Sequence, residues 1–197
     1  AMTALAARTV GCKPHEVLVA STGVIGHPLP MEKIEAGIVA AGRALRPDGL
    51  SKAARAILTT DLTPKCVSLR TRIDGRTVTL AGIAKGSGMI EPNMATMLSF
   101  LITDAAIAPP LLRKLLRAAA DESYNRVTVD GETSTSDTVF LLANGCAGNA
   151  LLRDAASAGA RHFAGALGEV TQELARAIAR DGEGATKLVT VRVSGAK

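Results

Sequence analysis

The chain is 197 residues long, with 47% hydrophobic but only 2% aromatic residues and a formal net charge of +5. This length can bury a sizeable core, in one large or two small domains, and the scarcity of aromatic rings means that Val, Leu, Ile and Ala must build it. The sequence disfavours a membrane protein, because no apolar run is long enough to span a bilayer. It also disfavours a disulfide framework or a metal site, because the three cysteines and three histidines are widely spaced.

The N-terminal part of the chain is expected to alternate helices with one short strand. Apolar residues recur at helical spacing in residues 31–45, and Ser51 is placed to cap the helix that follows it. An apolar run at residues 17–21 ends at Thr22 and Gly23, which could present a hydroxyl and a backbone amide side by side. From the residues alone, a plain strand-to-loop turn is the simpler interpretation of this pair. The expected elements are helices at residues 1–6, 31–45 and 52–57 and a strand at residues 17–21.

The clearest local signal is a β-hairpin. Two runs of alternating character, residues 67–73 and 76–80, meet at Asp74 and Gly75. Asp-Gly is a preferred pair for the two-residue type I′ turn, because both of its positions require a positive φ. We therefore expect two antiparallel strands, the second of which leads into a glycine-rich stretch.

This glycine-rich stretch, residues 85–100, is expected to be a tightly turned loop that feeds a core strand. Gly86 and Gly88 do not suit a helix interior, and Pro92 disfavours helix in the residue before it. Residues 96–103 are apolar and β-branched enough to form a buried strand. The stretch lacks the third glycine of a dinucleotide fingerprint and the Gly-Lys-Ser/Thr ending of a phosphate loop, so neither nucleotide motif is present. A glycine turn before a strand is the simplest interpretation of these residues.

The rest of the chain is expected to be mainly helical. Pro109 suits the first turn of a helix, and the polar residues 131–137 suit the N-terminus of another. Val170, Leu174 and Ile178 lie on one face of a third. The expected elements are helices at residues 109–116, 138–143, 149–158 and 163–179 and strands at residues 96–103, 125–130 and 188–193.

Residues 85–100 resemble the cleavage-site signature of the ornithine acetyltransferases, the glutamate N-acetyltransferases of arginine biosynthesis. Further stretches match that family in the same order along the chain, at residues 21–26, 59–65, 129–138 and 183–187. The resemblance implies an α/β fold, a layered sandwich of β-sheets and flanking helices of the ornithine acetyltransferase or DmpA type. The family has additional sequence on both sides, so we expect residues 1–197 to be one acetyltransferase-like region of a longer protein. Residues 1–95 and 96–197 would be its α-chain and β-chain portions after cleavage.

The resemblance also implies an activity. In the family the precursor cuts itself between the residues that match Ala95 and Thr96, and the freed threonine is the nucleophile. The expected reaction moves acetyl from N2-acetylornithine to glutamate through an acetyl-Thr96 intermediate. The family's oxyanion hole corresponds to the Thr22 hydroxyl and the Gly23 amide. The implied substrate-binding residues are Thr59, Lys85, Thr96 and Glu183.

Cofactors, partners and location follow from the same resemblance. It implies an enzyme without a cofactor or metal, although some members also accept acetyl-CoA as an acetyl donor. It further implies that the α and β chains associate as a heterotetramer in the cytoplasm, with no nucleic-acid or membrane partner.

The chemistry of the residues is consistent with these roles. A threonine hydroxyl is a weak nucleophile that needs a base, and an N-terminal threonine can use its own amine, whose reference pKa is about 7.7–8.0. Cleavage before Thr96 would free that amine. Lys85 is a suitable point charge for a substrate carboxylate, and Glu183 is a suitable partner for a substrate ammonium.

Two other functions are compatible with the sequence. One is an amidohydrolase or aminopeptidase with an N-terminal nucleophile, which would pass the acyl group to water. The other is a non-catalytic basic module, since the net charge of +5 permits a polyanionic partner. The basic residues are scattered, however, and few aromatic rings are present to stack on bases.

Overall fold

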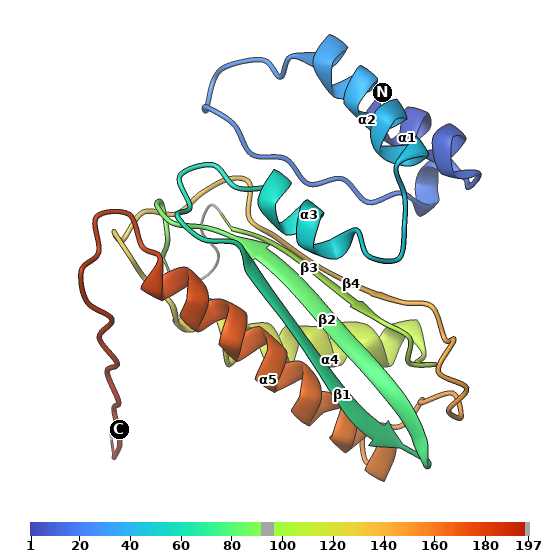
Figure 1. Cartoon of the computed structure of the whole chain (residues 1–197). Coiled ribbons are helices and arrows are strands. Elements are labelled where there is room, and N and C mark those ends of the chain that lie inside the picture. Colours follow the sequence, from blue (N-terminus) through green and yellow to red (C-terminus); the bar gives the residue numbers. More distant parts are fainter. Residues whose placement is uncertain (92–96, 196–197) are drawn as a thin grey trace. The chain divides into compact units, whose positions relative to one another are not determined.

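The computed structural model describes residues 1–91 and 97–195. The chain divides into two units, Ala1–Ala53 and Ala54–Lys197. The described residues contain a β-sheet and flanking helices, which confirms the predicted α/β class (Figure 1). Among the described helices, none combines the length and the apolar character needed to cross a membrane.

The first unit is helical. Its described elements are α1 (Met2–Val10), the 3-10 helix η1 (Pro14–Glu16), α2 (Met31–Arg43) and the start of α3 (Leu50–Ala56). Helix α1 ends at Gly11, whose φ of 79° gives the left-handed cap that a residue with a Cβ adopts at a cost. Helices α1 and α2 approach so closely that a Cβ on Gly42 would overlap the side chain of Thr9. The predicted helices of this part are therefore confirmed.

The strand predicted at residues 17–21 is wrong, because these residues have no regular secondary structure. The described part of the first unit offers no other strand with which they could pair. Leu18 and Val19 are exposed, although their apolar character favoured a buried strand. Thr22 and Gly23 thus follow an irregular segment, with Thr22 half-buried and Gly23 exposed.

The second unit is organised on a sheet, which in the described residues has four strands in the order β1-β2-β3-β4. These are β1 (Lys65–Ile73), β2 (Arg76–Lys85), β3 (Leu98–Thr103) and β4 (Thr138–Ala143). The first two pairs are antiparallel, and β3 pairs with β4 in parallel. Asp74 and Gly75 have φ angles of 51° and 75°, as the predicted type I′ turn requires. Lys65 pairs with Ala84, so the start of β1 lies beside the end of β2.

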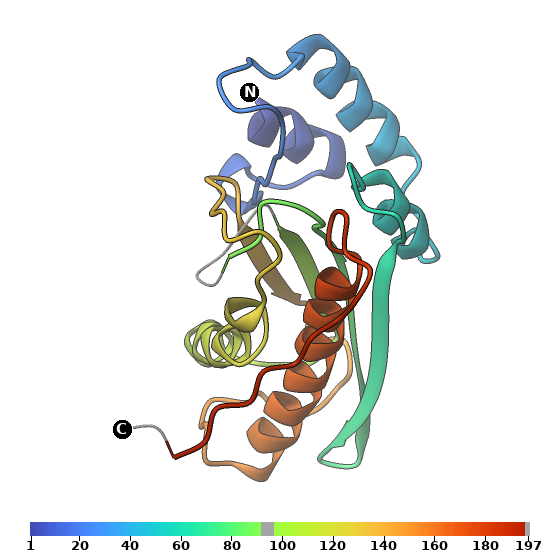
Figure 2. The same ribbon diagram turned by 90° about the vertical axis from the view of Figure 1, so that its left-hand side faces the viewer.

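Helices α4 (Pro109–Asp121) and α5 (Ala158–Arg180) form the core with this sheet (Figure 2). The apolar face of α5 is fully buried and consists of Phe163, Leu167, Val170, Leu174 and Ile178. It lies so close to β2 that a Cβ on Gly82 would stand 2.9 Å from the Cδ1 of Leu174. Glycine at this position therefore lets the long helix approach the strand that leads to Lys85.

The helix predicted at residues 138–143 is wrong, because these residues form β4. The segment Thr-Val-Phe-Leu-Leu-Ala is rich in β-branched and apolar residues, and its parallel partner β3 supplies the hydrogen bonds that a short helix would otherwise make internally. The preceding polar loop suggested a helix cap, but Asp137 instead accepts a hydrogen bond from the Met97 amide at 2.9 Å.

Three other predicted elements near the C-terminus are also wrong. The strand predicted at residues 125–130 does not form. The chain instead makes the 3-10 helix η2 (Tyr124–Arg126), and residues 127–130 have no regular secondary structure. Residues 149–157 form no helix: Leu152 pairs with Ile107 in an isolated parallel bridge, and the side chain of Asn149 bonds the backbone of Ala106. Residues 188–193 have no strand partner among the described residues, and Val189, Val191 and Val193 are exposed.

Candidate functional site

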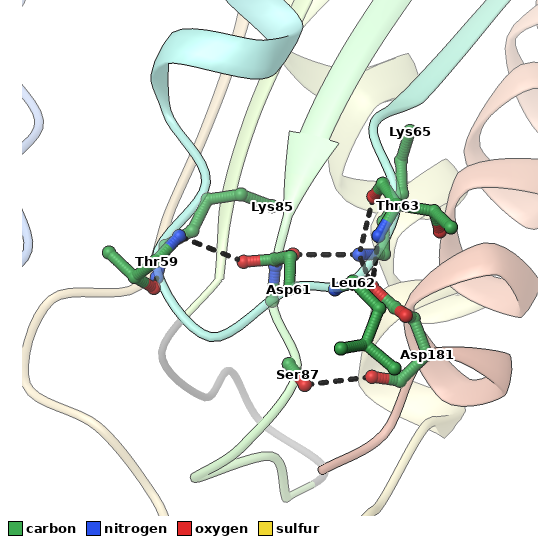
Figure 3. Close-up of polar contacts among 9 residues, drawn as sticks. Thr59, Asp61, Leu62, Thr63, Lys65, Lys85, Ser87 and Asp181 are labelled. Atoms are coloured by element: carbon green, nitrogen blue, oxygen red, sulfur yellow. Dashed lines mark hydrogen bonds and ion pairs between the residues drawn. The ribbon is translucent and has the colours of Figure 1, made fainter.

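Three segments that are distant in sequence meet at one end of the sheet. Residues 59–63 precede β1, residues 86–89 follow β2, and residues 181–183 follow α5 (Figure 3). They meet because β1 begins where β2 ends and because α5, packed along the hairpin, ends at the same place. Several of the predicted substrate-binding residues lie in or beside these segments, namely Thr59, Lys85 and Glu183.

A buried ion network lies at the centre of this junction. Nζ of Lys65 is 2.7 Å from Oδ1 of Asp61 and 2.6 Å from Oδ2 of Asp181. The three side chains are 1%, 0% and 6% exposed, so water screens these contacts very little. Each carboxylate comes from a different segment, and Lys65 joins them.

Asp61 also binds the backbone on both sides of the network. Its Oδ1 accepts a hydrogen bond from the Gly86 amide at 2.7 Å, and its Oδ2 accepts one from the Thr59 amide at 3.3 Å. Burial alone would raise the pKa of the Asp61 carboxyl, but the amide of Gly86 and the ammonium of Lys65 outweigh burial and hold that pKa below its ordinary value. Asp61 is therefore an anion that ties residue 59 to residue 86.

Asp181, the second carboxylate of the network, lies at the end of α5. Its Oδ2 accepts hydrogen bonds from the amides of Leu62 and Thr63, at 3.0 and 3.3 Å. Its backbone carbonyl accepts a hydrogen bond of 2.7 Å from the Ser87 hydroxyl, and the Ser87 carbonyl in turn accepts one of 2.8 Å from the Glu183 amide. Asp181 thus connects the first segment to the other two.

An open pocket of about 330 Å³ lies beside this network. Its lining combines hydroxyl, ammonium and carboxylate groups and consists of Thr59, Thr60, Lys85, Ser87, Gly88, Met89, Asp130, Glu132 and Glu183. The structure therefore brings together Thr59, Lys85 and Glu183, three of the predicted substrate-binding residues. The fourth, Thr96, and the cleavage-site residue Ala95 lie outside the described residues.

Lys85 is the cation of this pocket lining. Its Nζ donates a hydrogen bond of 3.1 Å to Oγ1 of Thr59, and the residue is 2% exposed. Burial lowers the pKa of the Lys85 ammonium, while the carboxylates of Asp61 and Asp137 oppose this change. A carboxylate bound in the pocket would stabilise the charged form of Lys85 further.

Carboxylates also line this pocket. Glu183 is so close to the glycine loop that a Cβ on Gly88 would stand 2.5 Å from its Oε2. Asp130 fixes the same loop, since its carboxylate accepts hydrogen bonds from the amides of Met89 and Ile90. Burial would raise the pKa of Asp130, but the backbone amides of Glu132, Ile90 and Met89 outweigh burial and lower it. The pocket can thus accept a molecule that carries both a carboxylate and an ammonium group.

The residues that hold this site together carry no recognisable signal in the sequence. Asp61, Lys65 and Asp130 lie inside stretches that match the acetyltransferase family, but no local pattern gave them a role. Asp181 contacts Lys65 across a separation of 116 residues, which periodicity cannot reveal. The described residues contain no group of three His, Cys, Asp or Glu side chains that could hold a metal ion.

Comparisons with known proteins identify relatives of the chain. The model of the ArgJ family matches residues 1–197. The arginine biosynthesis bifunctional protein ArgJ of Symbiobacterium thermophilum is 57% identical over 195 residues, which are 99% of this chain and 48% of that protein. The protein of the same name from Geobacter sulfurreducens is 52% identical over 99% of this chain and 49% of its own length. The chain spans about half the length of the curated relatives it matches.

A solved structure is also similar to this chain. It is the crystal structure of arginine biosynthesis bifunctional protein argJ from Bacillus halodurans, with 48% sequence identity and a TM-score of 0.45. The match covers 47% of this chain and 43% of that one.

Proposed function

This chain belongs to the ArgJ family, and we propose that it carries the site of a glutamate N-acetyltransferase, which moves acetyl from N2-acetylornithine to glutamate in arginine biosynthesis. The observation that supports this best is the pocket in which Lys85 and Thr59 lie with Glu183. N2-acetylornithine and glutamate each carry an ammonium and at least one carboxylate. A pocket with groups of both signs can therefore hold either molecule.

In the proposed binding mode, Lys85 pairs with a carboxylate of the substrate and Glu183 pairs with an ammonium. Thr59 contributes a hydroxyl that already accepts a hydrogen bond from Lys85. Since the pocket places these groups together, one site can serve donor and acceptor in turn. This is the physical basis for a reaction in two half-steps.

The proposed chemistry passes through Thr96. Its hydroxyl oxygen attacks the acetyl carbonyl of N2-acetylornithine, while its α-amine takes the hydroxyl proton. The negative charge that develops on the carbonyl oxygen is stabilised by the Thr22 hydroxyl and the Gly23 amide. The C–N bond then breaks, ornithine leaves with the proton on its α-amine, and an acetyl ester remains on Thr96. The α-ammonium of glutamate then gives one proton to the Thr96 α-amine, from which it passes to solvent, and the resulting neutral amine attacks the ester carbonyl. The bond between the acetyl carbon and the Thr96 oxygen breaks, and this oxygen takes a second proton from the attacking nitrogen, which restores the hydroxyl and releases N-acetylglutamate.

The free amine of Thr96 requires cleavage after Ala95, and we include self-cleavage in the proposal. The same hydroxyl would attack the Ala95 carbonyl, and water would hydrolyse the resulting ester. We further propose that the α and β chains stay associated as a heterotetramer in the cytoplasm. In this proposal no metal or cofactor takes part in the reaction, and acetyl-CoA can serve as an alternative acetyl donor.

Labelled N2-acetylornithine tests this function. We expect the label on the peptide that begins at Thr96 and its release as N-acetylglutamate when glutamate is added; a Thr96→Ala variant should stay unlabelled. Equal release to water without glutamate would instead identify an amidohydrolase. An unlabelled, uncleaved chain that binds nucleic acid in a salt-dependent manner would identify a basic binding module.

A further inference from the structure

Lys65 is a buried cation for which the proposed reaction has no direct use. It is 2% exposed, and it does not belong to the lining of the pocket. An ammonium group is unfavourable in such a place unless carboxylates compensate it, and Asp61 and Asp181 both do so at less than 3 Å. The two carboxylates of the network also accept hydrogen bonds from backbone amides, and these bonds hold the surrounding segments in place.

One carboxylate fixes the side of the pocket that carries the cation. Asp61 accepts the amides of Thr59 and Gly86, and Gly86 directly follows Lys85. The Lys85 ammonium in turn bonds the Thr59 hydroxyl at 3.1 Å. The mutual position of Lys85 and Thr59 thus depends on the orientation of the Asp61 side chain, which Lys65 holds.

The other carboxylate fixes the side that carries the anion. The carboxylate of Asp181 accepts hydrogen bonds from the amides of Leu62 and Thr63, and the backbone carbonyl of Asp181 accepts a hydrogen bond from the Ser87 hydroxyl. The backbone carbonyl of Ser87 accepts a hydrogen bond from the amide of Glu183. The backbone of Glu183 is therefore connected to the same lysine through two hydrogen bonds and one ion pair.

From this arrangement we infer that Lys65, Asp61 and Asp181 form a buried clamp that sets the spacing between the Lys85 and Glu183 sides of the pocket and so determines how tightly a substrate with both charges binds. The three are positioning residues, because they act through Thr59, Lys85 and Glu183 and do not line the pocket. The positioning role rests on the proposed function, whereas the joining of the three segments does not. Lys65 is the member whose loss would release both carboxylates together.

Substitution of Lys65 by methionine tests the clamp, with Lys114→Met as the matched control because Lys114 is an exposed lysine on α4. Hydrogen exchange should become faster at the amides of Thr59, Gly86 and Glu183 together, while the β1–β2 turn keeps its protection. Faster exchange in only one of the three segments would overturn the clamp. Lys114→Met should change none of them.

Kinetics test the positioning role separately. We expect Lys65→Met to raise the KM for N2-acetylornithine and glutamate by about tenfold or more while kcat falls by less than about threefold, and Lys65→Arg to recover part of the loss. An unchanged KM with fast exchange would overturn the positioning role. If the unsubstituted full-length protein transfers no acetyl group, the proposed function fails, but the exchange experiment still decides whether the clamp exists.

Asp181→Asn covers the case in which Lys65→Met does not fold. The asparagine retains a side-chain oxygen for Leu62 and Thr63 and leaves the backbone carbonyl that Ser87 uses, so only the ion pair is lost. We expect the same pattern of exchange and KM with a smaller amplitude. Exchange and KM equal to those of the unsubstituted protein would contradict the clamp.

Discussion

The amide of Met97 donates a hydrogen bond of 2.9 Å to Oδ1 of Asp137, which fixes a carboxyl group to the residue that directly follows Thr96 in the chain. The second oxygen, Oδ2, is buried and has no hydrogen-bond partner among the described residues. Burial raises the pKa of Asp137 to about 6, although the Met97 amide and the charge of Lys85 oppose this shift. An ionisable group thus lies at the start of β3, where the predicted nucleophile is attached.

The raised pKa of Asp137 predicts how stability depends on pH. A folded-state pKa above the ordinary value means that the folded protein binds this proton more tightly than the unfolded chain. The stabilising contribution is therefore present at low pH and is lost as the pH rises from about 4 to about 6. Asp137→Asn removes the titration while keeping an oxygen for the Met97 amide.

Urea unfolding of the Asp137→Asn variant and the unsubstituted protein from pH 4 to pH 7 measures this effect. We expect the difference in unfolding free energy to move in favour of the asparagine variant as the pH rises, by at most about 1.4 kcal/mol per pH unit. Taking the difference removes the contributions of other carboxyl groups, such as Asp61 and Asp130. A difference that is constant across this range would show that Asp137 titrates normally.

Local signals explain what the sequence predicted correctly. The β1–β2 hairpin was predictable because Asp74 and Gly75 encode the turn in two adjacent residues, and α5 because its apolar face repeats over many turns. Strand β4 was missed because its partner β3 lies about 40 residues away in sequence, and parallel pairing has no local signal. A polar loop before an apolar run looks the same before a strand as before a helix.

The residues of the site also fall into a group that the sequence predicts and a group that depends on long-range packing. Thr59, Lys85 and Glu183 were predicted through family resemblance, and the structure places them around one pocket. Lys65 and Asp181 were not predicted, because a buried ion pair between residues 65 and 181 exists only after α5 has packed on the hairpin. A charged residue at the start of a strand otherwise looks like an ordinary solvated side chain.

Self-cleavage is the next prediction. If Thr96 attacks the carbonyl of Ala95, the purified protein should contain a polypeptide that begins at Thr96, and Thr96→Ala should remain whole because no hydroxyl is available. Intact mass and N-terminal sequencing measure this directly. Efficient cleavage of the Thr96→Ala protein would exclude Thr96 as the nucleophile of the cleavage.

The oxyanion hole gives a separate kinetic prediction. If the Thr22 hydroxyl stabilises the charge that develops on the acetyl oxygen, Thr22→Ala should lower kcat by roughly 10²–10³ with little change in KM, because the interaction strengthens in the transition state. Thr22→Ser retains the hydroxyl and should keep most of the rate. A rise in KM at unchanged kcat would make Thr22 a binding residue.

The last prediction concerns the contact between Gly88 and Glu183 in the pocket. A Cβ at position 88 would stand 2.5 Å from Oε2 of Glu183, which is the far end of a flexible and exposed side chain. Gly88→Ala should therefore displace the carboxylate at little cost to folding, about 1 kcal/mol or less. If Glu183 pairs with the substrate ammonium as proposed, displacement of its carboxylate weakens that pair, and we expect KM to rise about tenfold with a smaller change in kcat.

Gly165→Ala is the matched control, because Gly165 lies on the exposed side of α5 and an added Cβ there meets nothing within 4 Å. It should stabilise the protein by about 0.5–1 kcal/mol through helix propensity and leave KM unchanged. Steady-state kinetics and urea unfolding on both variants separate the two effects. If Gly88→Ala lowers stability by several kcal/mol, the glycine loop is rigid and Glu183 cannot move aside. If KM stays at its original value in a stable Gly88→Ala protein, Glu183 does not bind the substrate ammonium.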